Sequence, residues 1–153
     1  MKRTAAAVSL CLATLGLSAC NEHGGIASNS KVCVDFKQNK AAPLITGAEG
    51  AGPVDECVKR WAYTLAGSHD TAGTVADAVV AACNVQLARW NQQTLNQPGS
   101  DTEAASLTTG QPTTPLGEHS TFTAGRALFY VVQARAGSCA PPPIVNGVPE
   151  GVG

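Results

Sequence analysis

The sequence predicts a mainly α fold: a small disulfide-braced helical domain, made of an antiparallel helix hairpin plus a third helix, with long loops and flexible termini. Three observations carry this prediction. Apolar residues recur at helical spacing between positions 54 and 90. Four cysteines, an even number without a C-x-x-C pair, are spread between positions 33 and 139. Stretches rich in Gly, Pro and Thr separate the helical segments.

The first predicted helix begins at Val54. Asp55 and Glu56 suit the positive N-terminal end of a helix dipole, and Gly67 is placed to end the helix. The apolar positions recur at i, i+3, i+4, i+7, i+8 and i+11, which is one stripe of an amphipathic helix. These positions are Val54, Cys57, Val58, Trp61, Ala62 and Leu65.

A second helix is predicted after a short turn. Asp70 or Thr71 can cap its N-terminus, and its apolar stripe runs on through position 90. Because the connection is short, the two helices are expected to form an antiparallel hairpin. The residues of the second stripe are Val75, Val79, Cys83, Leu87 and Trp90.

The hairpin suggests how the cysteines pair, although four cysteines allow three pairings in principle. Cys57 and Cys83 fall at similar heights on the two helices and lie on both apolar stripes, which favours a Cys57–Cys83 disulfide. Elimination then pairs Cys33 with Cys139 and ties the N-terminal arm to the far end of the chain. The lack of C-x-x-C weakens a zinc site and a redox-active pair, so neither a metal nor a cofactor is predicted.

The other segments are predicted from turn residues and spacing. Residues 31–36 read as an extended arm, and 94–118 read as a mobile loop within a single domain at 31–139. The tail at 140–153 is rich in Pro and Gly and is expected to be extended or disordered. The run "LFYVV" alone fits a buried strand, but helical spacing favours a third helix that Gly137 ends. Its predicted stripe is Phe122, Gly125, Phe129, Val132 and Ala136.

The first 19 residues have the pattern of a secretory signal peptide. Lys2 and Arg3 precede an uncharged apolar stretch at 4–16, which is too short to span a bilayer comfortably. A buried N-terminal helix and an ordinary signal cut after small residues are the alternatives. The run Leu17-Ser18-Ala19-Cys20 resembles the lipobox of bacterial lipoproteins. The resemblance implies that residues 1–19 are removed and that Cys20 carries a diacylglycerol and an amide-linked acyl chain such as palmitate.

This resemblance also implies a location. Residues 20–30 would be a lipid-anchored flexible tether, and two or three acyl chains hold a protein stably on a bilayer. Asn21 is the kind of residue that permits transport to the outer membrane, so we expect a cell-envelope protein anchored there and facing the periplasm. That compartment is oxidising, which suits disulfides. The runs "ECVKRWAY" and "VADAVVAAC" resemble small exported proteins of alphaproteobacteria, a resemblance that implies no activity.

Composition excludes nucleic-acid binding. Without residues 1–19 the chain has eight basic and eleven acidic residues, a net charge near −3. It has no basic block, and it has only two Trp, two Tyr and three Phe. Nucleic-acid binding relies on clustered Lys and Arg with stacking aromatic residues.

No motif points to catalysis. The sequence has no G-x-S-x-G, no H-E-x-x-H and no Gly-rich phosphate loop. Ser68, His69 and Asp70 include the residue types of a triad, but neighbours in sequence seldom contact one another in the required order. We therefore predict no catalytic residue. A small periplasmic hydrolase that uses His69 or His119 is kept as an alternative.

Tyr63 is predicted to face outward from the first helix. With Lys59 and Arg60 it forms a candidate recognition surface for anionic lipid or cell-wall carboxylates, with a solvated charged face as the plainer alternative. The leading hypothesis is thus a non-catalytic binding or accessory module of the cell envelope. Its partners would be the bilayer, through acylated Cys20, and an envelope protein or cell-wall component. A purely structural surface lipoprotein is the remaining alternative.

Overall fold

The computed structural model describes residues 31–37, 50–100, 102–106 and 109–152. The predicted signal peptide, Cys20 and the tether at 20–30 lie outside the described residues. Within the described ranges the chain is mainly helical and carries two disulfides, which confirms the predicted fold class. The elements in order are α1 (Ala51–Leu65), α2 (Ala72–Ala82), α3 (Asn84–Leu95), β1 (Ala104–Ala105), β2 (Pro112–Thr113), α4 (Pro115–Ala136), β3 (Ile144–Val145) and β4 (Val148–Pro149).

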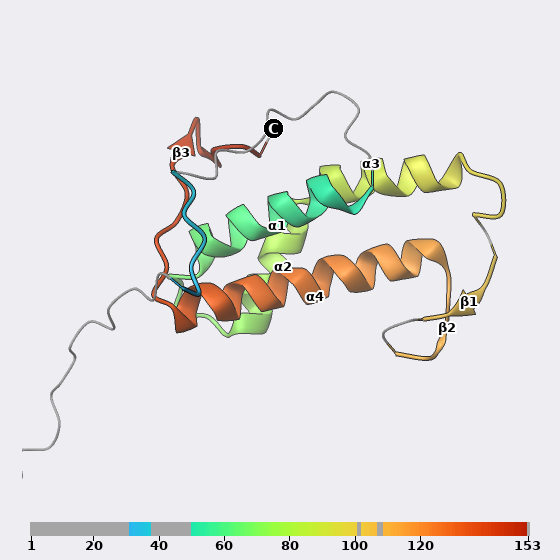
Figure 1. The fold of residues 1–153 in the computed structure, drawn as a ribbon, viewed down its shortest axis with the longest axis horizontal. Coiled ribbons are helices and arrows are strands. Elements are labelled where there is room, and N and C mark those ends of the chain that lie inside the picture. The colour runs from blue at the N-terminus through green and yellow to red at the C-terminus, as the bar shows by residue number, and fades with distance from the viewer. Residues whose placement is uncertain (1–30, 38–49, 101, 107–108, 153) are drawn as a thin grey trace, which may run out of the picture.

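The core lies between α4 and the first two helices. α4 packs along α1 and α2, and α3 packs against both α1 and α4 (Figure 1). The arm at 31–37 and the C-terminal hairpin of β3 and β4 lie at the same side of the molecule in this view. Fully buried core residues from the helices include Val54, Val58, Ala62, Val79, Cys83, Ala127 and Val131.

α1 begins at Ala51, three residues before the predicted start. Pro53 falls in its first turn, where a missing backbone N–H breaks no helical hydrogen bond. The N–H of Gly50 donates to the side-chain oxygen of Gln93 at 3.1 Å, which fixes the start of α1 against α3. The predicted stripe is correct, since four of its residues are buried, and Trp61 and Leu65 pack partly buried against the core.

The second predicted helix is two helices. Thr71 caps α2, because its hydroxyl oxygen accepts from the Thr74 N–H at 3.2 Å. At Cys83 the backbone leaves the helical region, with φ −100 and ψ 13, and α3 then continues in another direction (Figure 1). The Cys57–Cys83 disulfide bonds this residue to α1, so the break falls where the chain is cross-linked. Val75, Val79, Cys83 and Leu87 of the predicted stripe are nevertheless buried.

α4 confirms the predicted third helix but reverses its predicted buried face. Thr114 caps it by accepting from the Gly117 N–H at 3.2 Å, so it starts within the segment predicted as a loop at 94–118. The predicted stripe is exposed except for Phe122, which is partly buried. The side chains that pack into the core are instead Thr123, Ala127, Tyr130, Val131 and Ala134.

Two short hairpins complete the fold. β1 pairs with β2 in antiparallel register, Ala104 with Thr113 and Ala105 with Pro112. β3 pairs with β4 across Asn146 and Gly147, whose positive φ values of 53 and 80 suit a tight type I′ turn. The C-terminal tail is therefore an ordered hairpin through residue 152, and Val152 packs against the core.

Candidate functional site

The candidate recognition surface on α1 is not a surface. Tyr63 is 2 % exposed, because the arm at 31–37 folds over it. The Val34 N–H donates to the Tyr63 hydroxyl oxygen at 3.3 Å, and the Phe36 ring meets the Tyr63 ring edge-on at 5.1 Å. Burial raises the pKa of the Tyr63 phenol. The prediction that Tyr63 faces outward is thus wrong, because α1 is covered on both sides.

Arg60, the second residue of that predicted surface, is also buried, with 1 % exposure. Its guanidinium donates to a Glu56 carboxylate oxygen at 2.7 Å and to the Glu150 carbonyl at 2.6 Å. It also lies 5.0 Å from the centre of the Phe36 ring. One cation therefore holds three segments together: α1, the arm and the C-terminal hairpin.

Only Lys59 keeps part of the predicted exposure. Its ammonium group is 2.7 Å from Glu56 and 3.9 Å from Asp55, and its side chain is 21 % exposed. Burial acts to raise the pKa of Glu56, but the hydrogen bonds and positive charges of Lys59 and Arg60 outweigh it and lower that pKa. Lys59 and Arg60 thus form ion pairs within the domain.

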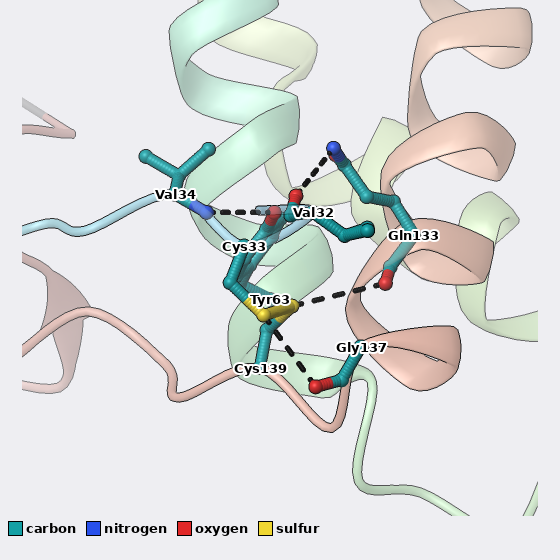
Figure 2. Close-up of a disulfide and its surroundings, with 7 residues drawn as sticks. All are labelled: Val32, Cys33, Val34, Tyr63, Gln133, Gly137 and Cys139. Atoms are coloured by element: carbon teal, nitrogen blue, oxygen red, sulfur yellow. Dashed lines mark hydrogen bonds between the residues drawn. A yellow bond between two sulfur atoms is a disulfide. The ribbon is translucent and has the colours of Figure 1, made fainter. Parts of the chain in front are cut away.

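The structure assembles a different site, around the Cys33–Cys139 disulfide (Figure 2). Both disulfides match the predicted pairing, and this one joins residues 106 positions apart. The Gln133 side chain of α4 donates to the Val32 carbonyl at 2.8 Å and so fastens the start of the arm. The Cys33 sulfur lies 3.5 Å from the Gly137 carbonyl oxygen. The arm is therefore fixed to the end of α4 by the disulfide and by the hydrogen bond from Gln133.

A groove runs between the arm and the segment that follows Cys139. We name it the arm groove; it is lined by residues 33–37 and 140–143 and has a volume of about 470 Å³. Its wall is mostly apolar, with Val34 and Phe36 on one side and Pro141, Pro142 and Pro143 on the other. The charged side chains at the groove are Asp35 and Lys37. An apolar groove with few polar groups suits an apolar group of a ligand or peptide rather than a phosphate or a sugar.

A second hollow of about 350 Å³ lies beside it and shares Pro141 with the arm groove. It is lined by the end of α1, the end of α4 and Cys139. The Cys33–Cys139 disulfide thus stands between two hollows. Sequence reasoning identified both cysteines but not the groove, because its walls lie more than 100 residues apart in the chain.

Gly137 is the residue on which this site's packing depends. A Cβ at this position would lie 2.7 Å from the Cys139 sulfur and 2.8 Å from the Cys33 sulfur. Its φ of −89 suits any residue, so only space is limiting. We expect Gly137→Ala to lower the free energy of unfolding by about 1–3 kcal/mol. Urea denaturation measures this change.

Gly125 is the matched control for that substitution, because it lies in the same helix with open space around it. Gly125→Ala is expected to raise stability by about 0.5–1 kcal/mol, since alanine loses less backbone entropy in a helix. Equal changes in the free energy of unfolding for the two substitutions would show that the sulfur atoms move to make room for a methyl group.

The two candidate catalytic histidines lie far apart. His119 is near the start of α4, whereas His69 is in the turn that Arg135 holds near the end of α4 through the carbonyls of Ala66, Ser68 and Asp70, each at 2.9 Å. The 16 residues from His119 to Arg135 span about 24 Å of helix. One site therefore does not include both.

Among the residues that the structure describes, neither histidine has the contacts of a triad. Ser68 donates directly to the Asp70 carboxylate, whereas a triad places the histidine between these groups. His119 is 7 % exposed, stacks on Trp90 with ring centres 3.5 Å apart, and meets the Asn91 side-chain oxygen at 2.8 Å. Burial lowers the pKa of His119. Its contacts pack α3 against α4.

A polar cluster that sequence reasoning missed links α1 to α4. Arg126 donates to the Asp55 carboxylate at 2.5 Å, and the Tyr130 hydroxyl donates to the same carboxylate at 3.0 Å. Burial and the Asp55 charge raise the pKa of Tyr130 far above its usual range. The hydrogen bond to Asp55 raises the pKa of Arg126. An ion pair and a hydrogen bond thus link α4 to α1 across the helix interface.

Within the ranges that the structure describes, no group of three His, Cys, Asp or Glu side chains is placed to hold a metal ion. No helix in the described part of the chain is both long and apolar enough to cross a bilayer. No protein-family model, curated protein or solved structure matches the chain.

Proposed function

We propose that this chain is an exported lipoprotein of the bacterial cell envelope, anchored through acylated Cys20, whose domain is a non-catalytic binding module. The arm groove is its ligand site. The anchor would hold the domain on the outer membrane, facing the periplasm. The ligand is an extended segment of an envelope protein that places an apolar side chain in the groove.

One observation carries this proposal: residues 33–37 and 140–143 form an apolar groove, and the Cys33–Cys139 disulfide joins its two walls. The arm at 31–37 starts eleven residues after Cys20 in the sequence. Both disulfides suit an oxidising compartment such as the one that a lipobox implies. The apolar wall favours binding by shape and burial, which needs no catalytic group.

The anchor is tested by the intact mass of the protein taken from its own membranes without reductant. We expect a chain that begins at Cys20, heavier by its acyl groups and lighter by four hydrogens for the two disulfides. A Cys20→Ala variant is the control and should gain no acyl mass. A chain that retains Met1 without acyl groups would overturn the lipoprotein proposal.

The binding role is tested in cells by a photo-crosslinking amino acid placed at Lys37, which is exposed and lines the groove. The same amino acid at Gln92, exposed on α3, is the matched control. We expect a discrete crosslinked partner from position 37 and none from position 92. Absence of a partner at both positions would favour a purely structural surface lipoprotein.

A further inference from the structure

The outward face of α4 is apolar along most of its length. Three of its large side chains are about half exposed: Leu128 at 43 %, Phe129 at 51 % and Val132 at 50 %. Exposed apolar groups that gather on one helix face mark a site of contact with another surface. We name this surface the outer α4 face; its residues, all exposed and none charged, are Thr121, Ala124, Gly125, Leu128, Phe129, Val132 and Ala136.

The start of the described chain lies at the edge of this face. Val32, itself 37 % exposed, is held through its carbonyl by Gln133, which follows Val132 on α4. Lys31 lies eleven residues after Cys20, and eleven residues reach at most about 36–40 Å. A bilayer that holds Cys20 is therefore within that distance of the outer α4 face.

Basic side chains flank the face. Arg126 lies 5.4 Å from the centre of the Phe129 ring with its side chain 37 % exposed, and its guanidinium is also ion-paired with Asp55. Arg135 lies on the other flank, where its guanidinium donates to three backbone carbonyls. Lys31 is exposed beside Val32. An apolar helix face with basic flanks is the arrangement that lies on a surface of anionic lipid.

We propose that the outer α4 face lies on the phospholipid surface that holds the acyl anchor, with Leu128, Phe129 and Val132 at the boundary of the acyl chains. This inference rests on the proposed lipid anchor and adds an orientation to it. The C-terminal hairpin lies on the far side of α1 from α4 (Figure 1) and therefore points away from the bilayer.

Quenching of tryptophan fluorescence by brominated acyl chains tests the orientation. The acylated full-length protein is reconstituted into vesicles of phosphatidylethanolamine and phosphatidylglycerol, with and without bromine on the acyl chains. Phe129→Trp reports on the outer α4 face, and Ile144→Trp on the C-terminal hairpin. The two sites are matched, because both side chains are 51 % exposed. Trp61 and Trp90 contribute the same background emission to both variants, and this background is measured on the unsubstituted protein.

We expect Phe129→Trp to lose emission in brominated vesicles and Ile144→Trp to match the background. Adding Val132→Glu to Phe129→Trp should abolish the loss, and circular dichroism checks that this surface change leaves the fold intact. Equal emission of both tryptophan variants in protein that floats with the vesicles would overturn the orientation and leave the anchor standing. Protein without acyl mass that does not float would overturn the anchor itself.

A second copy of this chain is the other occupant that the test distinguishes. Phe129→Trp would then escape quenching in floating protein, and chemical crosslinking in the vesicles would give a dimer. That result would overturn the lipid-facing orientation.

Discussion

Reduction of both disulfides is expected to unfold the domain at room temperature. A loop of 26 residues closed by Cys57–Cys83 corresponds to about 3.5 kcal/mol of unfolded-state entropy, and one of 106 residues closed by Cys33–Cys139 to about 4.8 kcal/mol. Domains of this size are stable by only about 5–15 kcal/mol in total. Circular dichroism during heating, with and without reductant, measures the effect.

The paired alanine variants separate the two contributions. Cys33→Ala with Cys139→Ala should lower the free energy of unfolding more than Cys57→Ala with Cys83→Ala, because the first pair closes the longer loop. Cys57 and Cys83 are almost fully buried, so their replacement also removes core packing. This loss acts in the opposite direction and makes the expected difference between the two paired variants smaller. A reduced protein that keeps its cooperative melting would show that the helices alone support the fold.

Arg60→Ala is expected to lower the free energy of unfolding by about 3 kcal/mol, because it removes a buried guanidinium from its ion pair with Glu56 and leaves the Glu150 carbonyl without its donor. It also removes the cation from the Phe36 ring. Urea denaturation at neutral pH gives the value.

Lys59→Ala is the control, because Lys59 directly precedes Arg60 and pairs with the same carboxylate, that of Glu56. Its ion pairs are partly exposed, so its loss should cost about 1 kcal/mol or less. Losses of similar size for the two variants would mean that burial of Arg60 adds nothing to its ion pair.

Much of the fold follows from spacing that is visible in the sequence. The stripes of the first two predicted helices are buried, and both disulfides join the predicted partners. Cys83 shows where local pattern fails: the stripe continues through it with no Gly or Pro, yet the backbone turns there. The turn lets α3 pack against α1 and α4, a contact between distant segments that periodicity does not encode.

α4 shows a second limit of prediction from the sequence. Its two faces are both apolar, so the 3.6-residue period is present twice and does not say which face is buried. The structure buries the face that carries Ala127, Tyr130 and Val131, from which the Tyr130 hydroxyl bonds to Asp55 of α1. Phe129 and Val132 stay outside. In the tail, by contrast, a signal was present: Asn146-Gly147 between two valines is a strong hairpin turn.

The candidate site was the least predictable part. Tyr63 and Arg60 look like surface residues on an isolated helix, and only the fold of the arm over α1 buries them. The arm groove needs the ends of the domain to meet, and that meeting depends on a disulfide. The cysteines predicted the link but not the cavity beside it.

The Cys33–Cys139 bond also decides how the protein bears tension. It turns the chain from 33 to 139 into a covalent ring that contains α1 to α4 and the second disulfide. A pull between the N-terminal side of Cys33 and the C-terminal hairpin passes through the two sulfur atoms and bypasses the ring. Once the bond from Arg60 to the Glu150 carbonyl is broken, the helices carry none of that load, and a pull of this kind does not unfold them.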